Sequence, residues 1–265
     1  MQATRCHFST VFVLISLWAG FQSASGQYSS NYQTNIISSV ASYWPGDYVV
    51  GSNTLADALL IKSGGALTTA DGYVGYLAAS VSNSVMVTGA GSVWTNGFMY
   101  FGYDGGWNTM VISNAGSVVE IGQGTYVGYD TTSSSNRVLV TGTNSTWNCA
   151  GHFFVGNSGS GNSLIITNGG QVVSGVSYLG ENTISTSNSV LVTGANSVWN
   201  NSSCLIGDNG SYNSMTINKG GRVVSSYAQL GYFYSANGNS AWVSDTNSVW
   251  DVSATSAILS VGLTG

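Results

Sequence analysis

The clearest pattern of hydrophobic and polar positions lies in the stretch "SNSVLVTGANSVWNNSSCLIG", residues 187–207. Its apolar residues gather in short runs, at 190–192 and 197–199, and do not recur at helical spacing. Gly, Asn and Ser separate these runs, and all three residue types favour turns. The stretch therefore predicts three short β-strands joined by three turns.

This stretch belongs to a repeat. Close copies occupy residues 82–102 and 135–156, and a related unit with a glycine pair or its equivalent lies at 57–75, 108–128, 162–180 and 213–231. Each unit ends on an apolar residue followed by glycine. The terminal glycines are Gly51, Gly75, Gly102, Gly128, Gly156, Gly180, Gly207, Gly231 and Gly262. The period is therefore about 26 residues, and tryptophan units alternate with glycine-pair units.

A 26-residue unit of three short strands predicts one rung of a parallel β-helix, that is, an all-β solenoid. A propeller blade would need about 40 to 45 residues. Neighbouring rungs would pair at about 4.8 Å, so about nine rungs would form a rod about 40 Å long.

Two columns of residues support the stacking. An asparagine recurs at one turn position, where its side-chain amide can bond to the copies above and below. This column begins with Asp57 and continues with Asn83, Asn108, Asn136, Asn162, Asn188, Asn213 and Asn239. The residue before each terminal glycine is always apolar, as an inward-facing position requires. The sequence thus predicts an asparagine ladder and an apolar core column.

Composition limits the classes of function. Only 6% of the 265 residues are charged, 43% are hydrophobic, and the net charge is −5. This balance is wrong for intrinsic disorder. With five Lys and Arg in total, the chain has no basic patch for a phosphate backbone, which argues against nucleic-acid binding.

The amino terminus has the features of a secretory signal peptide. A short leader with Arg5 precedes an apolar run at 11–21 and then small residues. We assign residues 1–26 to the signal peptide, 27–32 to a short leader and 33–265 to the solenoid, truncated at its carboxyl end if the chain is a fragment. The mature chain is expected to have no transmembrane segment and to be exported to the outer surface of a bacterium or beyond it.

Export would permit a disulfide between Cys149 and Cys204. The two cysteines follow their tryptophans by two and five residues, so they belong to different columns. They are also two rungs, or about 9 to 10 Å, apart along the axis, beyond the ~7 Å limit on Cα separation. We therefore predict two free thiols.

The sequence offers few side chains that could act in catalysis or bind a metal ion. Asp104, Asp130, Glu181 and Asp208 follow terminal glycines and are expected to share one edge of the rod, either as an acidic or calcium-binding groove or as solvated turn residues. His152, the one histidine after residue 26, is interpreted as a strand-edge residue. No pattern predicts a catalytic residue, a metal site or a cofactor.

The repeated tryptophans could face either the core or the solvent. We align Val93, Thr146, Val198 and Val249 with Leu67, Val118, Val172 and Val223, a column of nearly constant volume suited to a core. In the adjacent column, side-chain volume would then alternate between that of tryptophan and that of Thr or Val. Such large changes in volume favour an outward-facing position. On this basis we predict a surface aromatic ladder made of Trp94, Trp147, Trp199 and Trp250. The alternative is that the indoles are buried and hold the rungs together.

The alternation of "NSVLVTGANSVWNN…LIG" with "NSLIITNGGQVVS…YLG" resembles the strand repeats of bacterial autotransporter (type V secretion) passengers and of PEP-CTERM-associated proteins, over residues 33 to 262. The resemblance implies a surface-displayed passenger with no catalytic residues to transfer. The sequence departs from the family in one respect, because neither a carboxy-terminal translocator nor a Val-Pro-Glu-Pro sorting tail is recognised. This departure is expected of a fragment or a truncated relative. We expect a structural or adhesive protein whose partner is an extracellular polysaccharide or another cell-surface component. The alternative is a carbohydrate-active β-helix enzyme or a polysaccharide-binding module.

Overall fold

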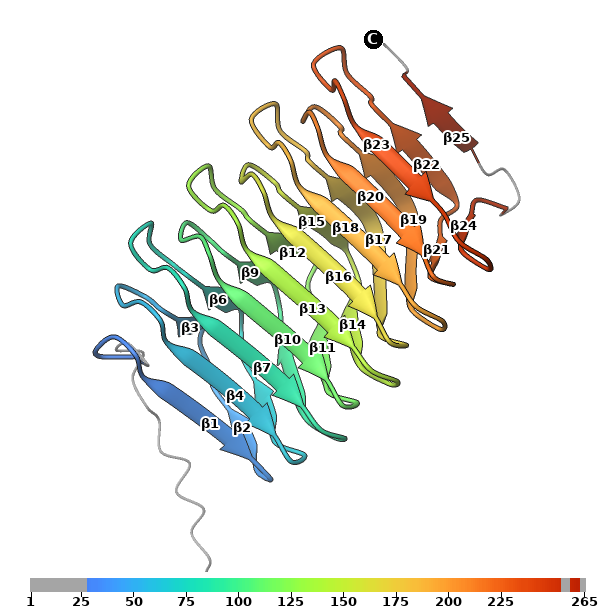
Figure 1. Cartoon of the computed structure of the whole chain (residues 1–265). Helices are drawn as coiled ribbons and strands as arrows, with labels where there is room; N and C mark the ends of the chain where they lie inside the picture. The colour runs from blue at the N-terminus through green and yellow to red at the C-terminus, as the bar shows by residue number, and fades with distance from the viewer. Residues whose placement is uncertain (1–27, 254–257, 263–265) are drawn as a thin grey trace, which may run out of the picture.

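The computed structural model describes residues 28–253 and 258–262, and the signal-peptide assignment lies outside these residues. The described part of the chain is all β and forms a parallel β-solenoid with a repeat of about 26 residues, as predicted. Successive turns advance in order from the amino to the carboxyl end (Figure 1). The described residues include no helix long and apolar enough to cross a membrane.

One side of the solenoid is a nine-stranded parallel sheet that faces the viewer in Figure 1. Its strands are β1 (Thr34–Ser38), β4 (Ala58–Lys62), β7 (Ser84–Thr88), β10 (Thr109–Ser113), β13 (Arg137–Thr141), β16 (Ser163–Thr167), β18 (Ser189–Thr193), β20 (Ser214–Asn218) and β23 (Ser240–Val243). From β4 to β20, residues alternate strictly between core and exterior, as the burial of Leu164 and Ile166 on either side of Ile165 illustrates.

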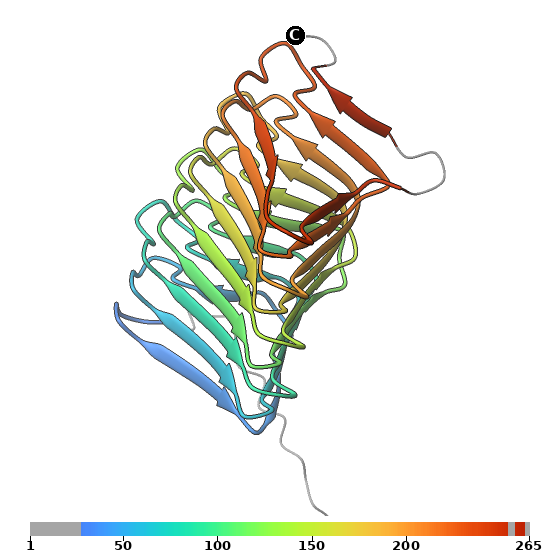
Figure 2. The same cartoon turned by 45° about the vertical axis from the view of Figure 1, so that its right-hand side comes forward.

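The other two sides belong to one sixteen-stranded sheet. The second side comprises β2 (Ala41–Tyr43), β5 (Ala66–Thr68), β8 (Val93–Asn96), β11 (Ser117–Glu120), β14 (Thr146–Cys149), β21 (Arg222–Val224) and β24 (Val249–Asp251). The third side comprises β3 (Tyr48–Val50), β6 (Gly72–Val74), β9 (Met99–Phe101), β12 (Gly124–Val127), β15 (His152–Val155), β22 (Tyr227–Leu230) and β25 (Ile258–Val261). In two turns both sides form one continuous strand, β17 (Gln171–Leu179) or β19 (Val198–Ile206), and these strands join the second side to the third in one sheet. Figure 2 shows the strands of the other sides behind the nine-stranded sheet.

The core follows the axis of the solenoid. The apolar residue before each terminal glycine points inward, as predicted, from Val50 through Ile206, where it is at most 1% exposed. The last member, Val261, is 68% exposed because no described turn covers it. At the opposite end, Tyr28 of the leader is buried, and its hydroxyl donates to the carbonyl of Ala58.

Candidate functional site

The predicted asparagine ladder is present and lies inside the solenoid. From Asn83 to Asn213, the Nδ2 of each asparagine donates to the Oδ1 of the asparagine one turn further on, with Asn136 to Asn162 at 3.0 Å and Asn162 to Asn188 at 3.1 Å. The same Oδ1 also accepts from the backbone N–H of the preceding asparagine, at 2.9 Å from Asn136 to Asn162. The ladder runs through Asn83, Asn108, Asn136, Asn162, Asn188, Asn213 and Asn239.

The terminal glycines accompany this ladder for a steric reason. Gly128 has a positive φ of 86°, which side chains rarely tolerate. A Cβ built on it would also lie 2.2 Å from Nδ2 of Asn162. Glycine and asparagine therefore recur together because the amide of one turn lies against the backbone of another.

The prediction of a surface tryptophan ladder is wrong. Trp94, Trp147 and Trp199 are completely buried, and Trp250 is partly buried in the last turn. Because strand side chains alternate between faces, an alignment slipped by one residue reverses the facing of every member. The pairing shows this slip: the core residues Leu67, Val118, Val172 and Val223 pair with the tryptophans, and not with Val93, Thr146, Val198 and Val249. In the first turn the equivalent position is held by Ser42, and Trp44 lies two residues further along the chain.

The core accommodates the tryptophans through a compensating column on the third side. Turns with tryptophan carry Met99, Phe153 and Cys204 there, whereas the alternate turns carry Gly72, Thr125, Ser177 and Ala228. A Cβ on Gly72 would lie 2.9 Å from Cζ2 of Trp94, so the indole extends over the glycine of the preceding turn. The large Met99 and Phe153 thus face small residues in the adjacent turns, whereas Cys204 is itself small.

Each indole N–H also has an acceptor in the preceding turn. Nε1 of Trp94 donates to the hydroxyl of Thr69 at 3.3 Å, and Nε1 of Trp199 donates to Ser174 at 3.1 Å. Trp250 donates to Ser225 in the same way. Buried indoles need such partners, and the acceptors occupy one polar column beside the core.

The acceptor for Trp147 is the carboxyl group of Glu120, which is buried inside the solenoid. The hydroxyl of Thr125 donates to the other carboxyl oxygen. Burial raises the pKa of Glu120 from 4.5 to about 8, against the opposing effect of the hydrogen bonds from Trp147 and Cys149. This carboxyl group is therefore largely protonated at neutral pH.

Cys149 and Cys204 are free thiols, as predicted, and both are buried. Cys149 pairs with Glu120 on the second side, whereas Cys204 pairs with Ser177 on the third side, so they occupy different columns. Burial raises the pKa of each thiol to about 12, with a further contribution from Glu120 at Cys149. Both side chains therefore remain protonated and act as small apolar residues.

A ladder of aromatic side chains does line the exterior, at positions other than the tryptophans. It lies on the third side and consists of Tyr73, Tyr100, Tyr126, Phe154 and Tyr178, one from each of five successive turns. The four tyrosines are half-buried, whereas Phe154, which is stacked between two of them, is buried. Neighbouring rings are stacked, with centroids 4.8, 5.0, 4.7 and 4.9 Å apart and planes within 10° of parallel. We call this set the outer aromatic ladder.

A second row interlocks with the outer aromatic ladder. Tyr76, Tyr103 and Tyr129 stack on one another at 5.1 Å. Their rings meet those of the first row edge to face, for example at 5.2 Å between Tyr100 and Tyr129. Stacking thus occupies much of the ring faces, while ring edges remain at the surface. Burial of its ring raises the pKa of Tyr100 to about 12, so the phenol stays protonated.

The sequence contains a signal for this ladder that the prediction of surface tryptophans did not use. The first row lies two residues before each terminal glycine, and the second row lies one residue after it. Since the residue immediately before the glycine points inward, its neighbour in the strand must point outward.

The four turn carboxylates occupy two adjacent positions. Asp104 and Asp130 directly follow Tyr103 and Tyr129, whereas Glu181 and Asp208 hold the position of these tyrosines in later turns. Glu181 and Asp208 occupy equivalent positions in successive turns, because their N–H groups bond to the carbonyls of Gly156 and Gly180. Partial burial raises the pKa of both carboxyl groups, and Asp208 adds to the rise at Glu181. Within residues 28–253 and 258–262, no three His, Cys, Asp or Glu side chains are placed to hold a metal ion.

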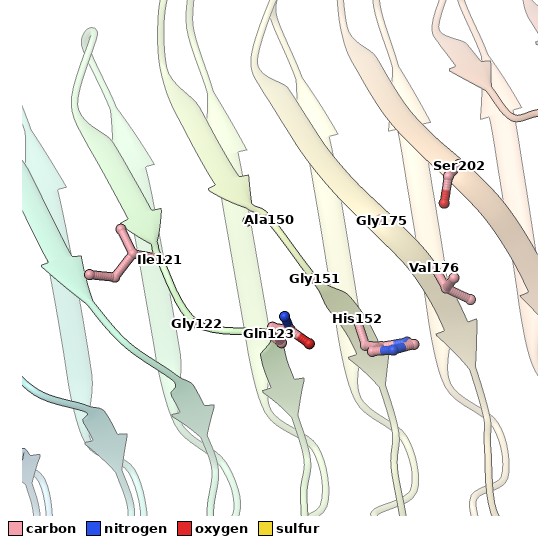
Figure 3. A pocket seen from close by; sticks show the side chains of 9 residues that line it. All are labelled: Ile121, Gly122, Gln123, Ala150, Gly151, His152, Gly175, Val176 and Ser202. Atoms are coloured by element: carbon pink, nitrogen blue, oxygen red, sulfur yellow. The ribbon is translucent and has the colours of Figure 1, made fainter.

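His152 lies at the exposed start of β15, as predicted for a strand-edge residue, and borders an open groove of about 360 Å³. Figure 3 shows this groove where the second side bends into the third, with Gln123, His152 and Ser202 among its lining residues. The imidazole ring lies 6.0 Å from the ring of Tyr178. The groove therefore adjoins the outer aromatic ladder and has a polar, glycine-rich lining without Asp, Glu, Lys or Arg.

The fold and these sites define a parallel β-solenoid with an asparagine ladder inside and a tyrosine-rich ladder outside. No family model, no curated protein and no solved structure matches the chain.

Proposed function

We propose that the chain is an exported, non-enzymatic repeat protein that acts as a structural and adhesive passenger on the cell surface or outside the cell. The observation that carries this proposal is the outer aromatic ladder, which continues over five turns of a stack held together from within. Contiguous tyrosine-rich surfaces are typical of interaction sites.

The interior supports a scaffold function. Indoles, the asparagine ladder and the buried Glu120 use the core for packing and hydrogen bonding. Export of residues 27–265 by the predicted signal peptide would place the rod outside the cytoplasm. The resemblance to autotransporter passengers and PEP-CTERM-associated repeats favours surface display, with an extracellular polysaccharide or another surface component as the partner.

A carbohydrate-active enzyme is the second candidate. It is favoured by the neighbouring carboxyl groups of Glu181 and Asp208, both with raised pKa, close to the ring of Tyr178. Two neighbouring carboxyl groups can supply a general acid and a general base, and a raised pKa helps the acid to keep its proton. The remaining edge carboxylates, Asp104 and Asp130, lie in other turns, so catalysis would depend on Glu181 and Asp208 alone. The outer aromatic ladder, which is longer than this pair, favours the adhesive function.

Incubation of purified residues 27–265 with insoluble cellulose, chitin and peptidoglycan separates the two candidates. We expect the protein to be retained on at least one of these polymers, with no soluble sugar released. The double variant Tyr100→Ser and Tyr126→Ser should be retained less, whereas Trp107→Ser, at a 66% exposed side chain outside the ladder, should bind like wild type.

Release of soluble sugars that Glu181→Gln abolishes would establish the enzyme instead. Retention on none of the three polymers would overturn polysaccharide adhesion. A reporter fused after residue 32 tests the localisation separately, since the proposal requires its export.

A further inference from the structure

Six tyrosines of the outer surface form a cluster unlike the other tyrosines of the chain. Tyr73, Tyr100 and Tyr126 stack in one row and Tyr76, Tyr103 and Tyr129 in the other, with every stacked pair at 4.8 to 5.1 Å between ring centroids. The backbone fixes this proximity, because Tyr73, Tyr100 and Tyr126 pair directly in adjacent strands. The stacked rings of each row thus come from different turns, far apart in sequence but in contact in space.

Such proximity suits oxidative coupling of phenols. Removal of one electron and one proton from a phenol gives a phenoxyl radical with spin density on the carbons next to the C–O bond. Two such radicals on neighbouring rings can form one C–C bond, after which each ring returns its displaced hydrogen to oxygen. Hydrogen peroxide, used by a peroxidase, accepts the two electrons and two protons and yields two molecules of water.

The cluster meets the requirements for this coupling. The rings are held beside one another, so the step is intramolecular and needs no diffusional encounter between protein molecules. The side chains of both rows face outward, and Tyr76 is 39% exposed, so small oxidants can reach them. The two described cysteines are buried and unpaired, which leaves the tyrosines as the side chains placed to link one turn to the next.

We propose that these six tyrosines are a site of oxidative modification, at which a peroxidase with hydrogen peroxide forms dityrosine links between successive turns of the solenoid. Each link would join residues of neighbouring turns covalently and restrict the separation of those turns. The proposal goes beyond the adhesive function, and its test contains no polysaccharide, so either can fail without the other.

The test oxidises purified residues 27–265 with a peroxidase and limiting hydrogen peroxide, then isolates the monomer by size exclusion. We expect dityrosine fluorescence in the monomer, a mass lower by two hydrogen atoms per link, a higher melting temperature, and peptic peptides that join the segments around Tyr73, Tyr100 and Tyr126. A variant with all six tyrosines replaced by phenylalanine should lose the monomer fluorescence and the gain in melting temperature.

The matched control replaces Tyr32, Tyr43, Tyr212 and Tyr234 by phenylalanine, since these side chains are 66 to 79% exposed and lie outside the cluster. It should keep the monomer signal. Equal signals from the six-phenylalanine variant and wild type would overturn the proposal, as would dityrosine confined to oligomers. If the six-phenylalanine variant does not fold, wild-type protein oxidised in guanidinium replaces it, and undiminished monomer coupling there would equally overturn the proposal.

Discussion

The buried tryptophan column and the outer aromatic ladder are both aromatic repeats along the same axis, yet they follow different rules. Inside, tryptophan occurs in alternate turns and lies over small residues such as Gly72. Outside, tyrosine or phenylalanine recurs in every turn from Tyr73 to Tyr178 and stacks on its own kind. A closed interior must balance volume between turns, whereas an exterior stack can repeat one ring because solvent takes up the difference. Aromatic periodicity alone therefore does not reveal which face a column occupies.

The largest loss of stability is expected from Trp147→Ala, which tests whether the tryptophan column belongs to the core. Its indole is completely buried and its Nε1 donates to Glu120, so truncation leaves both a cavity and a buried carboxyl group without one of its donors. We expect a loss of about 3 to 5 kcal/mol in the free energy of unfolding. Urea denaturation followed by circular dichroism measures it.

Trp242→Ala is the control for that variant, because this tryptophan lies on a strand of the nine-stranded sheet and is 67% exposed. Its effect should stay within about 0.5 kcal/mol. Similar losses for the two variants would contradict the assignment of the repeated tryptophan to the core.

The fold could be predicted from the sequence because it depends only on the spacing of recurring residues along the chain. The terminal glycines fix the 26-residue period, and the asparagine position is nearly invariant within it, so the internal ladder could be predicted. Both features depend on counting residues along the chain. Neither requires knowledge of which way a strand faces.

Strand facing on the second side could not be predicted for a physical reason. In β17, Val172 and Val173 are both valines, although Val172 is buried and Val173 is 41% exposed. With apolar residues on both faces, alternation does not identify the inner one, and a one-residue slip remains undetected. The volume argument then failed because the compensating residues, such as Gly72 and Thr125, lie on a different side of the solenoid.

A second test concerns the asparagine ladder. Asn162→Ala removes the Oδ1 that accepts both the backbone N–H and the Nδ2 of Asn136. Leaving these buried donors without that acceptor should cost about 2 to 3 kcal/mol. Thermal and urea unfolding report the loss, and Asn148→Ala, at an exposed position of β14, should be nearly neutral. A neutral Asn162→Ala would mean that the ladder adds little to stability.

A smaller effect is expected from pH through Glu120. Its folded pKa of about 8 lies above the ordinary value of 4.5, so the folded state binds the proton more tightly than the unfolded state does. Stability should therefore be highest below about pH 4.5, fall as pH rises, and level off above about pH 8. Between pH 5 and pH 7 we expect this group to lower stability by about 1 to 3 kcal/mol.

Glu120→Gln isolates that effect, because glutamine keeps an oxygen for the indole N–H of Trp147 and cannot ionise. Melting temperatures measured across this pH range should fall less steeply in the variant than in wild type. Parallel profiles for the two proteins would show that Glu120 does not change its protonation on unfolding in this window.

The smallest effect should come from the exterior. Tyr126 stacks on Tyr100 at 5.0 Å and on Phe154 at 4.7 Å, but its ring is only partly buried. Tyr126→Ala should therefore cost about 1 kcal/mol, within the range of about 0.5 to 1.5 kcal/mol for aromatic pairs. Tyr126→Phe should be almost neutral because it preserves both stacks, so the pair of variants separates ring stacking from the hydroxyl group. A loss from Tyr126→Ala as large as that from Trp147→Ala would mean that the outer aromatic ladder holds the turns together as strongly as the core does, and the contrast between the two columns would then be one of position alone.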